Sequence, residues 1–115
     1  VACNRDANFP VESGHLMAGC GAMVAAIEAA TGHTADFEIG KPNTFMLDIL
    51  IDRMQISLAD CLVIGDMLAS DILMANNANI PSIWISEMTT YPNEVPNSPQ
   101  PSLLMSSLDE ISKVI

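Results

Sequence analysis

The segment at residues 61–71, Cys-Leu-Val-Ile-Gly-Asp-Met-Leu-Ala-Ser-Asp, constrains most strongly what this chain can fold into. Four apolar residues in a row predict a buried parallel strand that ends at Gly65-Asp66. A second acid, Asp71, opens a predicted helix. Because ligands of open α/β sheets bind outside the carboxyl ends of the strands, Asp66 is predicted to lie at a ligand-binding edge.

Strands and helices alternate along the rest of the chain, and this order predicts the fold class. The predicted strands cover residues 37–39, 61–64, 82–85 and 102–105. The predicted helices cover residues 19–31, 44–54, 70–77 and 107–114, while residues 4–14 and 87–101 are predicted loops. We therefore expect an α/β fold, a Rossmann-like parallel sheet with flanking helices and right-handed crossovers.

The chain is strongly acidic, with a formal net charge of −10, and its permanent cations are Arg5, Lys41, Arg53 and Lys113. Nucleic acids and anionic membranes bind clustered basic residues, so we expect neither as a partner. The longest apolar stretch, Leu16–Ile27, is too short to span a bilayer. An anion bound at the predicted sheet edge would meet few cations other than Lys41.

Cysteine usage and the start of the chain bear on its cellular setting. Cys3, Cys20 and Cys61 are odd in number and lack Cys-x-x-Cys spacing, which argues against a disulfide framework or a zinc site. We therefore expect a reducing, cytoplasmic location. The chain begins at Val1 without a recognisable signal peptide, and we expect this N-terminus to be a cut end.

A lysine and two acids supply the chemistry expected at the sheet edge. The turn Gly40-Lys41-Pro42-Asn43 follows the predicted strand at residues 37–39. One cation and two carboxylates suit a phosphate group and a hard metal ion, and Mg²⁺ takes one or two carboxylates together with waters and phosphate oxygens. Asp66 suits a direct metal ligand. Asp71 can hold a metal-bound water, pair with Lys41, or cap its helix by accepting from backbone N–H groups.

These motifs resemble the haloacid dehalogenase superfamily of phosphatases and phosphotransferases. In that superfamily a characteristic Lys and a late Gly-Asp-x-x-x-Ser/Thr-Asp element complete a site built around a nucleophilic Asp. The Gly-Lys-Pro form, with Ala2-Cys3-Asn4-Arg5-Asp6 upstream and Met88-Thr89-Thr90 downstream, resembles the branch of p-nitrophenyl phosphatases and nucleotide-monophosphate-type phosphatases. The resemblance runs over nearly all 115 residues.

The resemblance implies a Mg²⁺-dependent phosphatase in which an Asp attacks phosphorus and water hydrolyses the aspartyl phosphate. The expected catalytic residues are Lys41, Asp66 and Asp71. Lys41 would contact the phosphoryl oxygens, and Asp66 would bind the metal directly. Asp71 would either hold a metal-bound water or support the direct metal ligands without touching the metal. The expected substrate-binding residues are Lys41, Asn4, Asp6 and Asn43.

The resemblance also implies that much of the enzyme lies outside this chain. Family members carry Asp-x-Asp-Gly near their start, and no Asp-x-Asp spacing occurs here. We expect residues 1–14 to be the end of a cap domain and its return linker, and residues 15–115 to be the C-terminal half of the core. The nucleophile would then lie on a missing N-terminal half, so this chain alone should be inactive. In the family the cap sets substrate selectivity, and almost all of the cap would be missing here. The expectation is therefore limited to a small phosphorylated substrate of unspecified identity.

Other functions stay open. A non-catalytic phosphate- or nucleotide-binding module would keep Lys41, Asp66 and Asp71 without the nucleophile. A receiver-like signalling domain also uses acids, a Lys and Mg²⁺, although the order and spacing here fit it poorly. In the resembled family the nucleophile strand lies beside residues 61–64. Without that strand we expect a bare apolar edge, which is either covered by a second copy or another chain, or left open.

Overall fold

The computed structural model describes residues 1–12, 14–86 and 98–113, and its contacts divide the chain into two units. The first unit is Val1–Gly40 and the second is Lys41–Ile115. The assignment of residues 1–14 to a cap domain and of residues 15–115 to a core stays a prediction. Met88-Thr89-Thr90, quoted for the family resemblance, and most of the expected loop at 87–101 lie outside the described residues.

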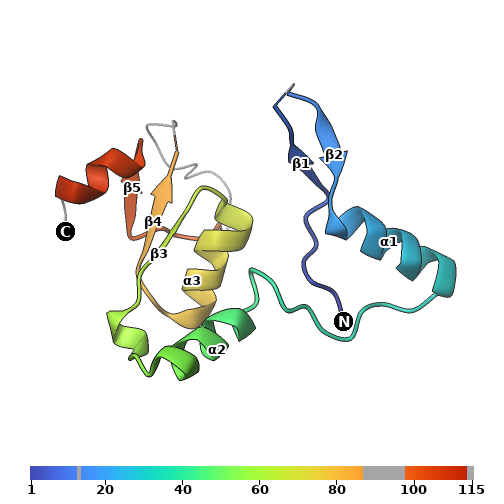
Figure 1. The fold of residues 1–115 in the computed structure, drawn as a ribbon, viewed down its shortest axis with the longest axis horizontal. Coiled ribbons are helices and arrows are strands. Elements are labelled where there is room, and N and C mark those ends of the chain that lie inside the picture. Colours follow the sequence, from blue (N-terminus) through green and yellow to red (C-terminus); the bar gives the residue numbers. More distant parts are fainter. Residues whose placement is uncertain (13, 87–97, 114–115) are drawn as a thin grey trace. The chain divides into compact units, whose positions relative to one another are not determined.

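The first unit is a hairpin followed by a helix (Figure 1). Strands β1 (Asn8–Pro10) and β2 (Leu16–Ala18) pair antiparallel. β1 lies in the predicted loop at residues 4–14, and no element was predicted at β2. The predicted helix is confirmed as α1 (Cys20–Thr31). Gly32 ends it in the left-handed conformation, with φ of 68°, and its N–H bonds to the Glu28 carbonyl, as helices ending in glycine commonly do.

A single β-bridge replaces the strand expected at residues 37–39. Ala2 forms a single parallel bridge with Glu38: the Ala2 N–H donates to the Phe37 carbonyl at 2.8 Å, and the Ile39 N–H donates to the Ala2 carbonyl at 3.0 Å. The prediction of a strand here is therefore wrong in extent, because the pairing stops after one residue.

Arg5 gathers two acids of the first unit. Its guanidinium donates two hydrogen bonds of 2.9 Å to Glu28 and a further one to Glu38. The hydrogen bond from Arg5, together with one from the Ala35 N–H, lowers the pKa of Glu28 from 4.5 to about 2. The same two carboxylates raise the pKa of Arg5 above its ordinary value.

We expect this cluster to lose its stabilising effect in acid. Because the pKa of Glu28 is lower in the folded chain than its ordinary 4.5, the contribution is present above pH 4.5 and is lost as the pH falls towards 2. A carboxyl-carbon NMR titration should place the Glu28 midpoint near 2. A midpoint near 4.5 would contradict the ion pair. Glu28→Gln should remove the matching pH dependence of thermal unfolding, and Glu12→Gln, at an exposed loop position, should leave it unchanged.

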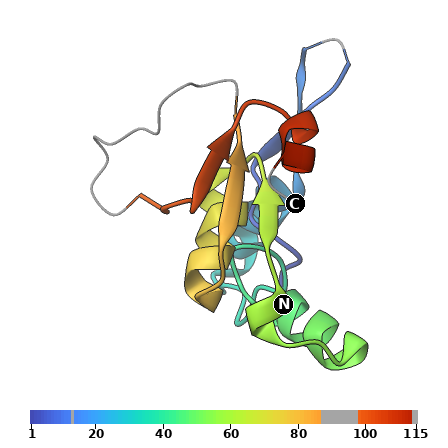
Figure 2. The same cartoon turned by 90° about the vertical axis from the view of Figure 1, so that its left-hand side faces the viewer.

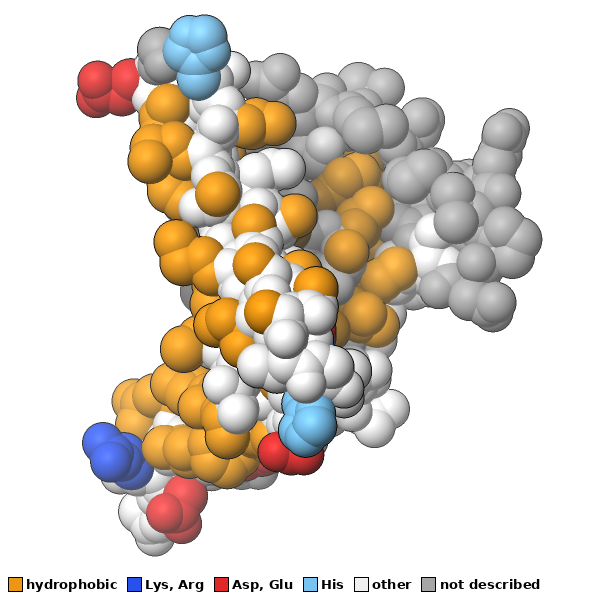
Figure 3. Space-filling model, turned by 90° about the vertical axis from the view of Figure 1, so that its right-hand side faces the viewer, with side chains coloured by type: hydrophobic (Ala, Val, Ile, Leu, Met, Phe, Trp, Pro, Cys, Tyr) orange, Lys and Arg blue, Asp and Glu red, His pale blue; other side chains and the backbone are white. Residues whose placement is uncertain are grey.

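Hydrophobic side chains form much of the surface drawn in Figure 3. In the hairpin and α1, large apolar side chains are about half exposed or more: Phe9, Leu16, Met17, Met23 and Ile27. The apolar face that predicted α1 is therefore not buried within its own unit. A helix of this kind needs a sheet or another helix to cover its apolar face.

The second unit is built on a parallel sheet, as the sequence predicted. Strands β3 (Val63–Gly65), β4 (Ser82–Ile85) and β5 (Leu103–Met105) lie side by side in the order β3-β4-β5 (Figures 1 and 2). Gly65 pairs with Trp84, so the carboxyl ends of β3 and β4 meet at one edge. With the helices this arrangement confirms the Rossmann-like α/β class.

The core of the second unit lies between the sheet and the helix that follows β3. A π-helical turn at Leu68–Ile72 runs directly into α3 (Leu73–Ala78), so the helical segment begins slightly before the predicted Ser70 or Asp71. Asn79 ends it with φ of 55°, as expected. The buried hydrophobic residues of this unit are Ile72, Ala75, Ile80, Ile83, Trp84 and Met105.

Strand β3 is an edge strand within the described residues, and it is less buried than predicted. Leu62 is 41% exposed and Ile64 is 39% exposed, because β3 pairs only with β4. This agrees with the expectation of an apolar edge. That a second copy or another chain covers this edge stays a prediction.

The remaining helices also leave apolar residues in solvent. In α2 (Phe45–Met54) the side chains of Met46, Leu50 and Met54, which share one helix face, are exposed by half or more. A single 3₁₀ turn precedes β3 at Leu58–Asp60.

The last described helix differs from the prediction. It is a 3₁₀ helix at Leu108–Lys113 rather than the helix predicted at residues 107–114, and Leu108 is 64% exposed. The Ser106 hydroxyl donates a hydrogen bond to the Glu110 carboxylate. Across the described ranges, no helix has the length and apolar character needed to cross a membrane.

Candidate functional site

Two of the predicted site residues form an ion pair within the second unit. Lys41 Nζ lies 2.5 Å from Asp71 Oδ1, although the two residues are 30 positions apart in the chain. The Asp71 side chain is 9% exposed and that of Lys41 is 51% exposed. The ammonium group therefore meets a buried carboxylate on one side and remains open to an anion on the other.

The second oxygen of Asp71 fixes the turn after β3. Asp71 Oδ2 accepts a hydrogen bond of 3.1 Å from the Met67 N–H, which caps the start of the helical segment. Of the three roles considered for Asp71, the structure thus shows two together: the pair with Lys41 and the cap.

Gly65 makes room for this arrangement. A Cβ atom at position 65 would lie 2.3 Å from the Asp71 Cβ and 2.5 Å from its Oδ2. A Cβ atom does not approach non-bonded atoms this closely, so any other residue at position 65 would displace the Asp71 side chain. The glycine of the Gly-Asp element is therefore explained by close packing.

Asp66 follows β3 directly at the carboxyl end of the sheet, where the sequence placed it. Its side chain is exposed, and its backbone carbonyl accepts a hydrogen bond of 2.8 Å from the Trp84 indole N–H. A hollow of about 240 Å³ lies beside it, lined by Ile64, Gly65, Asp66, Ile85 and Leu108. Asp66 thus presents a carboxylate next to open volume.

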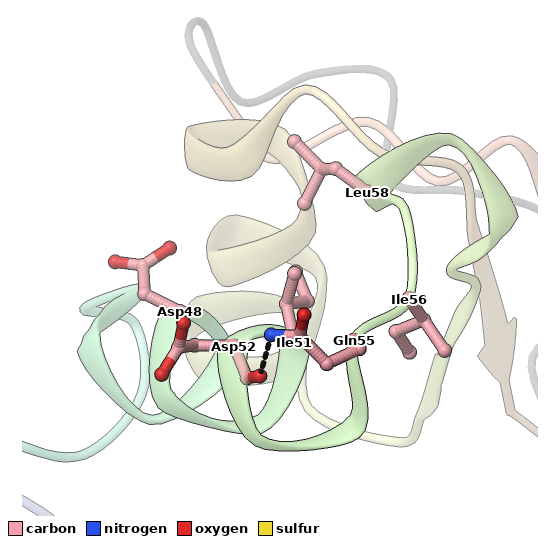
Figure 4. Close-up of a pocket in the computed structure, with 6 residues that line it drawn as sticks. All are labelled: Asp48, Ile51, Asp52, Gln55, Ile56 and Leu58. Atoms are coloured by element: carbon pink, nitrogen blue, oxygen red, sulfur yellow. Dashed lines mark hydrogen bonds between the residues drawn. The ribbon is translucent and has the colours of Figure 1, made fainter.

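A larger hollow lies elsewhere in the second unit and contains none of the predicted site residues (Figure 4). Its volume is about 490 Å³, and its lining residues are Asp48, Ile51, Asp52, Gln55, Ile56 and Leu58. The Gln55 amide there donates to the Asp52 carbonyl at 2.6 Å. Because this hollow offers no cation to a phosphate, we assign the candidate site to the strand ends instead.

The loop that carries Lys41 is tied at two points. Asn43 Oδ1 accepts a hydrogen bond of 2.9 Å from the N–H of Phe45, the first residue of α2, although Thr44 rather than Asn43 stands at the N-cap of that helix. Asn77 Nδ2 donates to the Pro42 carbonyl at 3.0 Å. The role of Asn43 in substrate binding stays a prediction. Its side-chain oxygen already accepts a backbone hydrogen bond in this structure.

Asn4 and Asp6 belong to the first unit. Asn4 Oδ1 accepts a hydrogen bond of 3.1 Å from the Asp6 N–H, a local turn of the kind that Asn commonly makes. Their expected part in substrate binding stays a prediction.

The donor set suits a hard cation. Asp66 offers an exposed carboxylate, whereas both oxygens of Asp71 are engaged, by Lys41 and by the Met67 N–H. Asp66 therefore fits direct coordination of Mg²⁺, and Asp71 fits a place behind it. Within residues 1–12, 14–86 and 98–113, no three His, Cys, Asp or Glu side chains gather as a metal cluster.

Sequence reasoning missed two polar contacts at the site. Trp84 was predicted only as part of a strand, and Asn77 only as part of a helix. A tryptophan directly across from the Gly-Asp element on the next strand could have pointed to the first contact, since a buried indole N–H needs an acceptor. No sequence signal pointed to Asn77.

Comparison with known proteins places this chain in a family. A model of the family described as HAD-hydrolase-like matches residues 38–111. An acid sugar phosphatase from Staphylococcus haemolyticus is 29% identical over 110 residues. The solved structure of a 4-nitrophenylphosphatase from Thermotoga maritima superposes with a TM-score of 0.79 at 30% identity. A glycerol phosphate phosphatase from Mycobacterium tuberculosis, solved in complex with calcium, gives 0.66 at 37% identity.

This chain spans less than half the length of these relatives. The match covers 95% of this chain but 41% of the acid sugar phosphatase, and 95% of this chain but 42% of the 4-nitrophenylphosphatase. For the Mycobacterium tuberculosis enzyme the shares are 76% and 25%.

Proposed function

Since the chain belongs to the HAD-hydrolase-like family, we propose that the protein containing it is a Mg²⁺-dependent phosphomonoester hydrolase acting on small phosphorylated metabolites. The observation that carries this proposal is the pair of Lys41 and Asp71, 2.5 Å apart, in which Asp71 also accepts from the N–H of Met67, the residue that follows Asp66. A positive group and a metal-binding carboxylate at one sheet edge are what a phosphate ester requires.

Each of the three residues has a part in the proposed reaction. Lys41 binds the phosphoryl oxygens and offsets their charge, which lets a carboxylate nucleophile approach an anionic ester. Asp71 holds the Lys41 ammonium in place. Asp66 binds Mg²⁺. When bound, Mg²⁺ would neutralise further phosphate charge and orient the ester.

The nucleophilic Asp, which would form the aspartyl phosphate, is proposed to lie outside these 115 residues. The chain alone would then bind phosphate and metal but hydrolyse nothing. The same proposal includes a cytoplasmic location, because Cys3, Cys20 and Cys61 are free thiols, as is usual in the reducing cytosol. It includes no nucleic-acid or membrane partner, because the net charge is −10.

The test uses the full-length protein and this chain side by side. We expect the full-length protein to hydrolyse p-nitrophenyl phosphate with Mg²⁺, to lose activity with EDTA and to recover it when Mg²⁺ is restored. The chain alone should show no turnover. An intact, folded full-length protein without activity on a panel of phosphomonoesters would overturn the proposal. If it bound inorganic phosphate with Mg²⁺ nonetheless, the non-catalytic binding module would be favoured instead.

A further inference from the structure

One peptide unit at the site, between Asp66 and Met67, is held from both sides. Its carbonyl, that of Asp66, accepts a hydrogen bond of 2.8 Å from Trp84 Nε1. Its N–H, that of Met67, donates to Asp71 Oδ2 at 3.1 Å. Holding this peptide restrains the backbone at Asp66, and so restrains the direction in which the Asp66 side chain leaves it.

The hydrogen bond from Trp84 acts where the sheet no longer does. The ladder between β3 and β4 ends with the pair Gly65 and Trp84, so Asp66 is the first residue beyond it. Within the described residues β3 has a neighbour on one side only. The indole N–H therefore hydrogen-bonds the chain one residue beyond the last β3–β4 pair, at the Asp66 carbonyl.

Trp84 is well suited to hold that position. It is 5% exposed and lies in β4, the central strand of the sheet. A buried aromatic side chain has few rotamers available, and its N–H must find an acceptor. The position of the donor is thus set by the core, and the position of the Asp66 carbonyl follows from it.

The contacts continue from this peptide to the cation. Trp84 holds the Asp66 carbonyl, the Met67 N–H of the same peptide bonds to Asp71, and Asp71 Oδ1 bonds to Lys41. A single series of hydrogen bonds therefore joins the core to all three predicted catalytic residues.

We propose that Trp84 is a positioning residue, which fixes the Asp66–Met67 peptide and thereby aims the Asp66 carboxylate and the Asp71–Lys41 pair. The consequences for catalysis and for Mg²⁺ binding rest on the proposed function, in which Asp66 binds the metal, whereas the consequence for backbone order does not. Groups that orient a metal ligand without touching the metal typically change metal affinity by 10- to 100-fold.

The test is Trp84→Phe in the full-length protein, which removes the N–H and keeps an aromatic ring. We expect the Mg²⁺ dissociation constant, measured by calorimetry, to rise about tenfold. Amide hydrogen exchange at Met67 should accelerate, and more Mg²⁺ should be needed for half-maximal activity. As a control, Ile83→Val shortens a buried neighbour in the same strand, whose side chain points to the opposite face of the sheet. It should change neither the Mg²⁺ affinity nor exchange at Met67.

A folded Trp84→Phe protein with unchanged Mg²⁺ affinity and unchanged exchange at Met67 would overturn the inference. Absence of phosphatase activity in the wild type would instead overturn the proposed function, because both other measurements need no turnover. If the variant does not fold, NMR of the wild type decides: the Trp84 indole proton should exchange slowly and shift when Mg²⁺ is added. A rapidly exchanging indole proton that ignores Mg²⁺ would sink the proposal.

Discussion

Asp66→Asn in the full-length protein is expected to lower phosphatase activity at least a hundredfold, because an amide oxygen replaces the one exposed carboxylate proposed to bind Mg²⁺ directly. The fold should be kept, since the hydrogen bond from Trp84 goes to the backbone carbonyl of Asp66, which the substitution leaves in place. Activity on p-nitrophenyl phosphate over a range of Mg²⁺ concentrations measures the effect. Part of the loss should be regained at high Mg²⁺.

Asp60→Asn is a matched control for this variant. It makes the same change of charge on an exposed aspartate at the other end of β3, in the turn at Leu58–Asp60. We expect it to leave activity and Mg²⁺ dependence unchanged. Equal losses in both variants would mean that charge alone matters, and the metal role of Asp66 would be withdrawn.

Lys41→Met should lower activity by about 10²- to 10³-fold, the usual effect of removing one group that stabilises charge in the transition state. It should also destabilise the protein by roughly 1–3 kcal/mol, because the buried Asp71 carboxylate would keep only its Met67 hydrogen bond. Urea unfolding of the full-length protein and steady-state kinetics measure the two effects separately.

Two further variants separate the roles of Lys41. Arg53→Met removes another of the four cations from an exposed position on α2 and should change neither activity nor stability appreciably. In Lys41→Met combined with Asp71→Asn, the buried charge is gone, so stability should recover in part while activity stays low. Recovery of activity in the double variant would show that Lys41 only neutralises Asp71 and does not act on the phosphate.

The elements that the sequence predicted best are those with a strong local signal. The helices predicted at residues 19–31 and 70–77 end close to where the structure ends them, at Gly32 and Asn79, two residue types that adopt the left-handed backbone found there. Apolar runs between turns located β3, β4 and β5. The hairpin of β1 and β2 was missed because each strand has three residues and every one is exposed, so no alternation of apolar and polar residues marks it.

Burial was predicted less well than secondary structure. The apolar stripes of α1 and α2 were recognised, yet Met23, Leu50 and Met54 are half exposed or more. Periodicity shows that a face is apolar, but what covers it depends on parts of the fold that are distant in sequence or absent from it. The same reason explains the exposure of Ile64 in β3.

The candidate site could be predicted in part. Lys41 and Asp71 were expected together at one sheet edge, and the structure pairs them. The strand expected before Lys41, however, is a single bridge outside the β3-β4-β5 sheet, so the pair was predicted on a partly wrong premise. The contact from Trp84 to the Asp66 carbonyl could not be predicted, because it depends on the register that sets Trp84 beside Gly65. Register is a property of two strands and cannot be read from either one alone.

The Asp71 carboxylate occupies the space where a side chain at position 65 would begin. The closest Asp71 atom is its Cβ, at 2.3 Å, so the two positions restrict each other: while any side chain stands at 71, only hydrogen fits on the α-carbon at 65. In a library randomised at both positions, alanine and serine at 65 should survive only beside glycine at 71. Related chains that have lost the acid should therefore keep the glycine.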